Sequence, residues 1–162
     1  MSQVKAIPEG YHSVTPYLSI VGAAQAIDFY KKAFGAQELY RMPGPDGKVG
    51  HAEIQIGDSR VMLADEEPSM GSFGPKSIGG TPVGLLIYLE NVDKVFEQAI
   101  AAGSKVLKPL KDQFYGDRSG SLEDPFGHKW HLATHMEDVA PDEMGRRLKE
   151  VMEKQALEPA LD

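Results

Sequence analysis

The chain has 162 residues, 41% of them hydrophobic and 25% charged. This is the size and composition of one folded domain, or of two small halves sharing a core, and it excludes a large multidomain machine and a wholly disordered chain. The 24 acidic residues outnumber the 17 basic ones and give a net charge of -7, so we expect neither nucleic acid nor an anionic membrane as a partner. Cysteine is absent, which excludes disulfides, thiolate metal sites and cysteine nucleophiles.

The beginning of the chain, MSQVKAIPEGYHS, lacks the apolar segment of a secretory signal. No stretch approaches the roughly 18 apolar residues that a membrane-spanning helix needs. We therefore expect a cytoplasmic protein without a membrane partner.

The first half of the chain predicts a β-α-β-β-β unit. Residues 14–21 alternate with the two-residue period of a strand. In residues 23–34 apolar side chains recur every three to four positions, as in an amphipathic helix, and Gly35 follows where a left-handed cap would end it. Three short strands separated by turns are then predicted at residues 37–41, 51–56 and 60–64.

The second half repeats this order after a stretch rich in glycine and proline. The repeat has a strand at residues 83–89, a helix at 92–102 that ends at Gly103, and strands near 105–107, 119–123 and 129–133. Two copies of one unit predict a core or a cleft shared between them.

The chain therefore divides into five expected segments. They are an N-terminal tail (1–11), a first β-α-β-β-β module (12–65), a Gly/Pro-rich linker (66–82), a second module (83–135) and an acidic C-terminal helix and tail (136–162). Pro141 and the acids that follow it suit a helix N-terminus, and an apolar stripe along the rest favours a packing or dimer-contact helix.

The repeated module, with AIDFYKKAFGA in its first helix and EDPFGHKW near its end, resembles the vicinal oxygen chelate superfamily. This group includes glyoxalase I, extradiol dioxygenases and bleomycin-resistance proteins, and the C-terminal third of the chain is most similar to the PhnB-like branch. The resemblance implies an α+β fold in which two β-α-β-β-β modules form an open mixed β-barrel around a cleft, with the helices outside. It also implies a small-molecule ligand, and a homodimer is the expected assembly.

Strand alternation predicts which side chains face this cleft. In the second module the apolar positions of residues 83–89 belong to the core, which leaves Gly84, Leu86 and Tyr88 facing the cleft. The other expected cleft residues are Thr15, Tyr17, Ser19, His51, Glu53, Gln55, Val61, Leu63, Ser119, Ser121 and His131.

Superfamily enzymes of the glyoxalase I type bind a divalent metal through His or Glu side chains on the first and fourth strands of each module. The matching positions are Thr15, Leu63, Gly84 and His131, and only His131 can ligate a metal. We therefore expect no metal site of the usual kind and no other cofactor. An alternative set is His51, Glu53 and His131, whereas His131 by itself is either a ligand contact or a hydrogen-bonded part of the wall.

The segment FYGDRSG offers further ligand contacts. Phe114 and Tyr115 are expected to stack on a ligand together with Tyr17 and Tyr88. Arg118 either binds a carboxylate or phosphonate or braces the turn by pairing with Asp117.

Three functions remain open at this point. The first is a protein that binds a small organic molecule, using Thr15, Tyr17, Gln55, Tyr88, Phe114, Tyr115, Arg118, Ser121 and His131. The second is a lyase, isomerase or dioxygenase assisted by a divalent metal, with Glu53 and His131 as candidate catalytic residues. The third is a non-catalytic interaction module.

Overall fold

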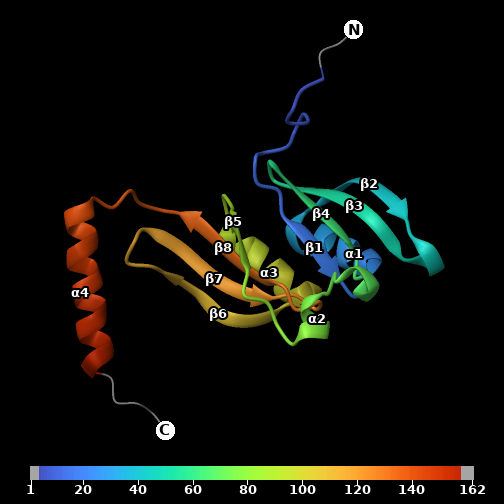
Figure 1. The fold of residues 1–162 in the computed structure, drawn as a ribbon. Coiled ribbons are helices and arrows are strands. Elements are labelled where there is room, and N and C mark those ends of the chain that lie inside the picture. Colours follow the sequence, from blue (N-terminus) through green and yellow to red (C-terminus); the bar gives the residue numbers. More distant parts are fainter. Residues whose placement is uncertain (1–3, 158–162) are drawn as a thin grey trace.

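The computed structural model describes residues 4–157 and contains two successive β-α-β-β-β modules (Figure 1). The elements of the first module are β1 (Tyr17–Ile20), α1 (Ala23–Phe34), β2 (Gln37–Pro43), β3 (Val49–Ile56) and β4 (Ser59–Asp65). Those of the second are β5 (Gly84–Tyr88), α3 (Val92–Ala102), β6 (Lys105–Asp112), β7 (Asp117–Glu123) and β8 (Lys129–His135). The α+β fold with two repeated modules, predicted from the sequence, is confirmed.

Each module forms its own four-stranded mixed sheet. The strand orders are β1-β4-β3-β2 and β5-β8-β7-β6, and in both sheets only the first strand runs parallel to its neighbour. The parallel pairs follow from the helix that crosses over after the first strand. The sheets remain separate and do not close into a barrel, so the expected open barrel is a pair of curved sheets in this chain.

Local sequence signals set the ends of both module helices. Asn91 Oδ1 accepts a hydrogen bond from the Lys94 amide at the start of α3. Gly35 and Gly103 adopt left-handed conformations, with φ of 68° and 118°, directly after α1 and α3. The helices predicted at residues 23–34 and 92–102 are therefore the observed ones.

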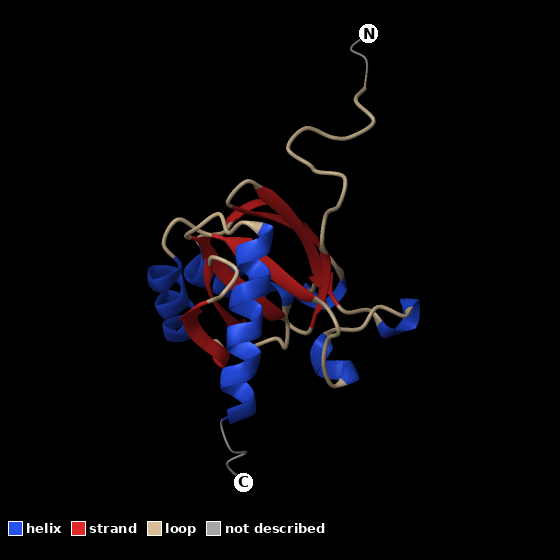
Figure 2. Ribbon diagram, turned by 90° about the vertical axis from the view of Figure 1, so that its left-hand side faces the viewer, coloured by secondary structure: helices blue, strands red, loops and turns tan. Residues whose placement is uncertain are grey.

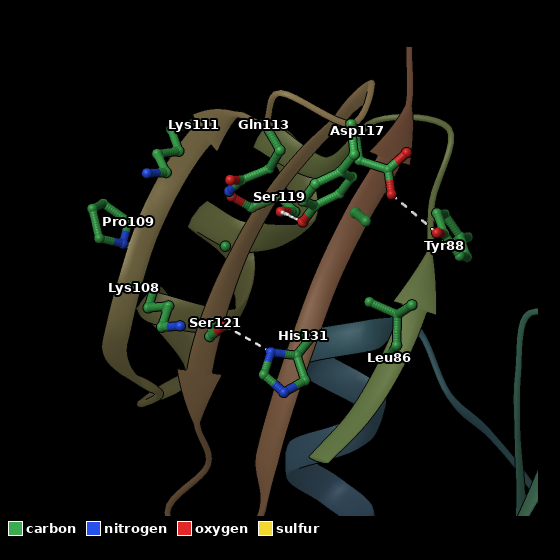
Figure 3. Close-up of a pocket in the computed structure, with 13 residues that line it drawn as sticks. Leu86, Tyr88, Lys108, Pro109, Lys111, Gln113, Asp117, Ser119, Ser121 and His131 are labelled. Atoms are coloured by element: carbon green, nitrogen blue, oxygen red, sulfur yellow. Dashed lines mark hydrogen bonds between the residues drawn. The ribbon is translucent and has the colours of Figure 1, made fainter. Parts of the chain in front are cut away.

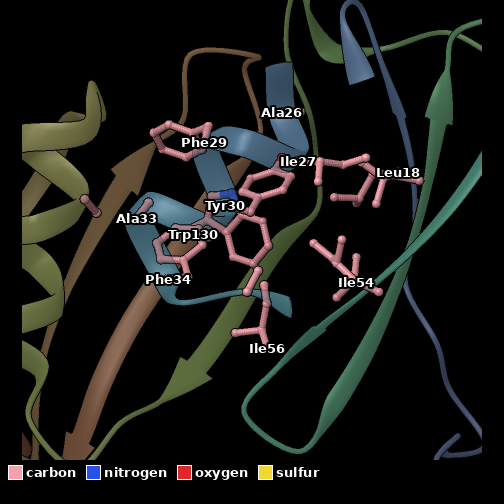
Figure 4. Packing of buried hydrophobic residues seen from close by; sticks show 14 of the residues in the cluster. Leu18, Ala26, Ile27, Phe29, Tyr30, Ala33, Phe34, Ile54, Ile56 and Trp130 are labelled. Atoms are coloured by element: carbon pink, nitrogen blue, oxygen red, sulfur yellow. The ribbon is translucent and has the colours of Figure 1, made fainter. Parts of the chain in front are cut away.

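The core lies where the two modules meet, because α1 and α3 pack against each other there. Trp130 of β8 lies against Tyr30 and Phe34 of α1, with ring centroids 5.3 and 4.8 Å apart (Figure 4). Ile27 and Ile54 extend this cluster into the first module, and both are fully buried. The helices thus cover one face of each sheet and leave the other face open.

Several strand boundaries differ from the expected ones. The first strand starts at Tyr17 rather than at residue 14, and β6 continues to Asp112 although Pro109 interrupts its pattern. An edge strand tolerates proline because its outward N–H groups need no partner. The segment 66–82, expected to be a linker, contains two short helices, η2 (Pro68–Met70) and α2 (Pro75–Ile78). A short 3-10 turn, η1 (Pro45–Gly47), joins β2 to β3.

The last helix, α4 (Pro141–Leu157), stands apart from both sheets (Figure 1), and it is the long helix in front of the strands in Figure 2. Arg147 ties it to the preceding loop through an ion pair of 2.8 Å with Glu137. Residues 1–3 of the expected tail and 158–162 of the C-terminal segment lie outside the described residues. Between residues 4 and 157, no helix combines the length and the apolar character that a membrane span requires.

Candidate functional site

The open face of the second sheet carries a hollow of about 650 Å³ (Figure 3). Four residues expected to contact a ligand line it: Tyr88, Tyr115, Ser121 and His131. Ser119, expected on the cleft face, also lines it, as do Lys108, Lys111 and Gln113, which the sequence did not indicate. We refer to this hollow as the second-sheet pocket.

The strand register explains why these side chains share one face. Lys108 on β6, Ser121 on β7, His131 on β8 and Leu86 on β5 are successive cross-strand partners and form one row. Directly paired residues point to the same side of a sheet. A second row, parallel to the first, consists of Lys111, Ser119, Ala133 and Tyr88.

The ring of His131 is fixed at the floor of the second-sheet pocket. Its Nδ1 lies 2.7 Å from Ser121 Oγ, and Ser121 is 6% exposed. On the other side the ring lies against Gly84 of β5, where a Cβ atom would collide with His131 Nε2. The serine and the glycine together fix the orientation of the imidazole in the pocket.

A chain of hydrogen bonds closes the far end of this pocket. The Tyr88 hydroxyl donates to Asp117 Oδ2 at 3.0 Å, and His135 Nδ1 lies 2.7 Å from Asp117 Oδ1. His135 Nε2 faces Asp138 at 3.0 Å. Hydrogen bonds to Asp117 and then to Asp138 raise the pKa of His135 above its ordinary value. Asp117 reaches His135 because the two residues are cross-strand partners on β7 and β8, whereas Asp138 follows three residues later in the chain.

The open face of the first sheet carries a separate polar cluster. His51 Nδ1 lies 3.1 Å from the Tyr17 hydroxyl, and His51 Nε2 lies 3.5 Å from Glu53. Arg60 pairs with Glu53 at 3.4 Å and stacks on the Tyr11 ring, 4.4 Å from its centroid. The Tyr11 hydroxyl, His51 and Arg60 hold the pKa of Glu53 below its ordinary value, which makes this carboxylate a weaker proton acceptor.

The predicted cleft face of β4 is wrong by one residue. Val61 and Leu63 are buried in the core, with 5% and 0% of their surface exposed. Met62 lies on the open side, because it pairs with Glu53 in the register. Residues 61–64 are all apolar, so alternation fits either phase, and only packing against α1 decides between them.

The remaining predicted ligand residues do not join the second-sheet pocket. Thr15 lies in a different hollow between the modules, and its hydroxyl donates to the His12 carbonyl at 3.3 Å. The Gln55 amide turns back to the Gly57 carbonyl at 3.0 Å. Phe114 meets the Tyr115 ring edge-on, with centroids 5.3 Å apart. Tyr17 belongs to the first sheet, as described above.

Arg118 lies on the helix-covered face of β7, opposite to the second-sheet pocket. Its guanidinium pairs with Asp93 of α3 at 2.7 Å and with Asp112 of β6 at 3.0 Å. It therefore braces α3 against the sheet. Its carboxylate partners are Asp93 and Asp112, whereas the sequence had suggested Asp117.

Two repeated modules with a polar, concave sheet face define a protein of the glyoxalase class. Residues 18–132 match the Glyoxalase/Bleomycin resistance protein/Dioxygenase superfamily, and the chain belongs to this superfamily. The resemblance that the sequence motifs carried is thereby confirmed.

The chain is 47% identical over 135 residues to an uncharacterized protein of Mycobacterium bovis, covering 82% of this chain and 89% of the relative. Among solved structures, TioX from Micromonospora sp. ML1 matches with a TM-score of 0.61 and 23% identity, over 80% of this chain and 100% of TioX. A PhnB protein from Bacillus cereus matches with a TM-score of 0.59 and 22% identity, over 76% of this chain and 99% of its own. At these identities the two structures support the fold.

The donor set of this chain does not fit the usual metal of the superfamily. Gly84 has no donor atom, Leu63 is in the core, and Met62 beside it carries a thioether, which is a poor ligand for a hard divalent ion. His51 and Glu53 lie on the first sheet, whereas His131 lies on the second. Over residues 4–157 of a single chain, no three His, Asp or Glu side chains come close enough to hold a metal ion.

Proposed function

We propose that this protein binds a small organic molecule in the second-sheet pocket. The observation that carries the proposal is the Ser121–His131 pair, fixed at 2.7 Å on the floor of a hollow of about 650 Å³. This volume lies within the range of small-molecule sites, and a few oriented polar groups among apolar ones are typical of such sites. Tyr88 and Tyr115 supply aromatic surface at one end.

We also propose that the working form is a homodimer. The open face of the first sheet exposes about half of the Tyr17, Tyr40 and Met42 surfaces, at 53%, 51% and 46%. On α4, Leu148 is 42% and Met152 61% exposed. Apolar groups gathered on a sheet face and a detached amphipathic helix are favourable surfaces to bury, and a second copy of the chain is the partner always present with it.

Native mass spectrometry of the untagged protein, purified without a chelator, tests both proposals. We expect a dimer that carries or accepts a small molecule, and we expect His131→Ala to lose that molecule while remaining a dimer. A protein that stays monomeric at every concentration contradicts the dimer. A pocket that yields no ligand in the natural protein and accepts none from a fragment collection contradicts the binding function.

The same spectrum bears on the two other functions. One divalent ion per subunit, lost in His131→Ala, would make metal-assisted lyase, isomerase or dioxygenase chemistry the leading function. Loss of a biological activity on truncation after His135, with the pocket still binding its ligand, would favour an interaction module that acts through α4. Neither result is expected if the second-sheet pocket is the functional centre.

A further inference from the structure

The second-sheet pocket presents two lysines in a protein whose net charge is -7. Lys108 and Lys111 come from β6, and both line the hollow (Figure 3). They are three residues apart but share a face, because the strand is irregular around Pro109 and pairs Lys108 with Ser121 and Lys111 with Ser119. An irregularity of this kind re-aims side chains toward one side of a sheet.

Nearby carboxylates are engaged elsewhere. Asp112, which follows Lys111, pairs with Arg118 on the opposite face at 3.0 Å. Asp117 is 8% exposed and is held by Tyr88 and His135. Within residues 4–157, neither Lys108 nor Lys111 takes part in an ion pair. The neighbouring carboxylates pair instead with Arg118 and His135. Since no carboxylate in the described part of the chain pairs with either lysine, the β6 end of the pocket carries unpaired positive charge.

The opposite wall of the pocket is aliphatic and aromatic, and its one hydroxyl, that of Tyr88, is bonded to Asp117. Leu86 and Tyr88 of β5 stand at the ends of the same two cross-strand rows and are 53% and 60% exposed. Each row thus runs from an ammonium group on β6, through a serine hydroxyl on β7, to an apolar side chain on β5. His131 lies in the row that starts at Lys108, beside Ser121.

We infer that the ligand of this pocket is an amphiphilic organic anion, with a carboxylate, phosphonate or phosphate group at the β6 end and an apolar body over β5. The oxyanion binds Lys108 and Lys111, since charge-assisted hydrogen bonds are stronger than neutral ones. It also accepts hydrogen bonds from Ser119 and from Ser121, whose hydroxyl is free to donate when His131 Nδ1–H donates to Ser121 Oγ. The apolar part covers Leu86 and Tyr88 and removes their surface from water. This inference rests on the proposed function and specifies its ligand class.

Two probes that share one ring but differ in charge test the ligand class. Phenylphosphonate and benzamide are each titrated into the protein, and binding is followed through the NMR signals of Ser119, Ser121 and His131. The charge variant is Lys108→Gln/Lys111→Gln. The matched control is Lys32→Gln/Lys94→Gln, which removes the same charge from exposed positions on α1 and α3.

We expect phenylphosphonate to bind at least about tenfold more tightly than benzamide. A tenfold difference in affinity corresponds to about 1.4 kcal/mol, which one hydrogen bond to a charged group can supply. The pocket variant should lose this preference and the control should keep it. Equal binding of the two probes, or a preference that survives in the pocket variant, overturns the anion inference while leaving small-molecule binding intact. If neither probe moves these signals, the inference fails together with the proposed site.

Discussion

The Tyr30 hydroxyl of α1 donates a hydrogen bond of 2.8 Å to Oδ2 of Asp124, which lies 94 positions later in the chain, in the second module. The indole of Trp130 donates to the same oxygen at 2.9 Å. The other oxygen, Oδ1, accepts from the backbone amides of Phe126 and His128, each at 2.9 Å. A carboxylate that is 3% exposed is thus fully hydrogen-bonded, and it connects the two modules at the core.

Replacing Tyr30 by Phe should destabilise the protein by about 1 to 3 kcal/mol, because the buried Asp124 carboxylate loses one of its hydrogen-bond donors. Burial and then the charge of Asp124 raise the pKa of Tyr30 well above its ordinary value, so the hydroxyl is a proton donor at neutral pH. Urea unfolding monitored by circular dichroism measures the effect. Tyr40→Phe, at a half-exposed site on β2, is the control and should change stability little. Equal effects of the two substitutions would show that the bond to Asp124 contributes nothing.

Gly84→Ala should displace the His131 ring, since the added Cβ would collide with Nε2. We expect the Ser121–His131 hydrogen bond to weaken and stability to fall by about 1 kcal/mol, the usual contribution of one such bond. The nitrogen chemical shifts of the His131 ring report the first effect and urea unfolding the second. Gly145→Ala is the control, because no atom lies within 4 Å of its added Cβ and alanine favours a helix. An unchanged His131 spectrum in Gly84→Ala would contradict the predicted clash.

Stability should depend on His135 in a pH-dependent way. The folded-state pKa of His135 is raised by Asp117 and then Asp138, so its contribution is fully present below the unfolded pKa of about 6.5 and is lost as the pH rises through the folded pKa. His135→Gln should therefore lower the urea midpoint more at about pH 5.5 than at about pH 9. The exposed His12→Gln serves as the control. A loss of the same size at both pH values for His135→Gln would rule out the charged contact.

Arg118→Gln should leave ligand binding in the second-sheet pocket unchanged within about twofold, because its side chain points to the face of β7 opposite to the pocket. Its guanidinium is directed to Asp93 and Asp112. The measurement is the phenylphosphonate titration. Lys111→Gln, from the neighbouring strand but facing the pocket, is the comparison and should weaken binding. If Arg118→Gln weakens phenylphosphonate binding as much as Lys111→Gln does, Arg118 contributes to the ligand site and the prediction is wrong.

The sequence by itself determined the two repeated modules and most of their faces. The glycines after residues 34 and 102 end the helices through backbone conformations that other residues rarely adopt. On β8, Trp130 and Leu132 alternate with His131, so polarity alone assigns the core side and the pocket side. Tyr88, Tyr115, Ser121 and His131 were selected on such grounds or from the family resemblance, and the fold brings them to one pocket.

Only the tertiary structure decided the rest. Because residues 61–64 of β4 are all apolar, their pattern does not show which alternate residues face the core. Packing against α1 was needed to place Leu63 inside and Met62 outside. The irregular pairing around Pro109 brings Lys108 and Lys111 to one face against the two-residue period. Arg118 found its partners on α3 and β6, at Asp93 and Asp112, which lie 25 and 6 positions before it in the chain. A periodic pattern records local backbone geometry, whereas the charge of a pocket depends on which strands the fold places side by side.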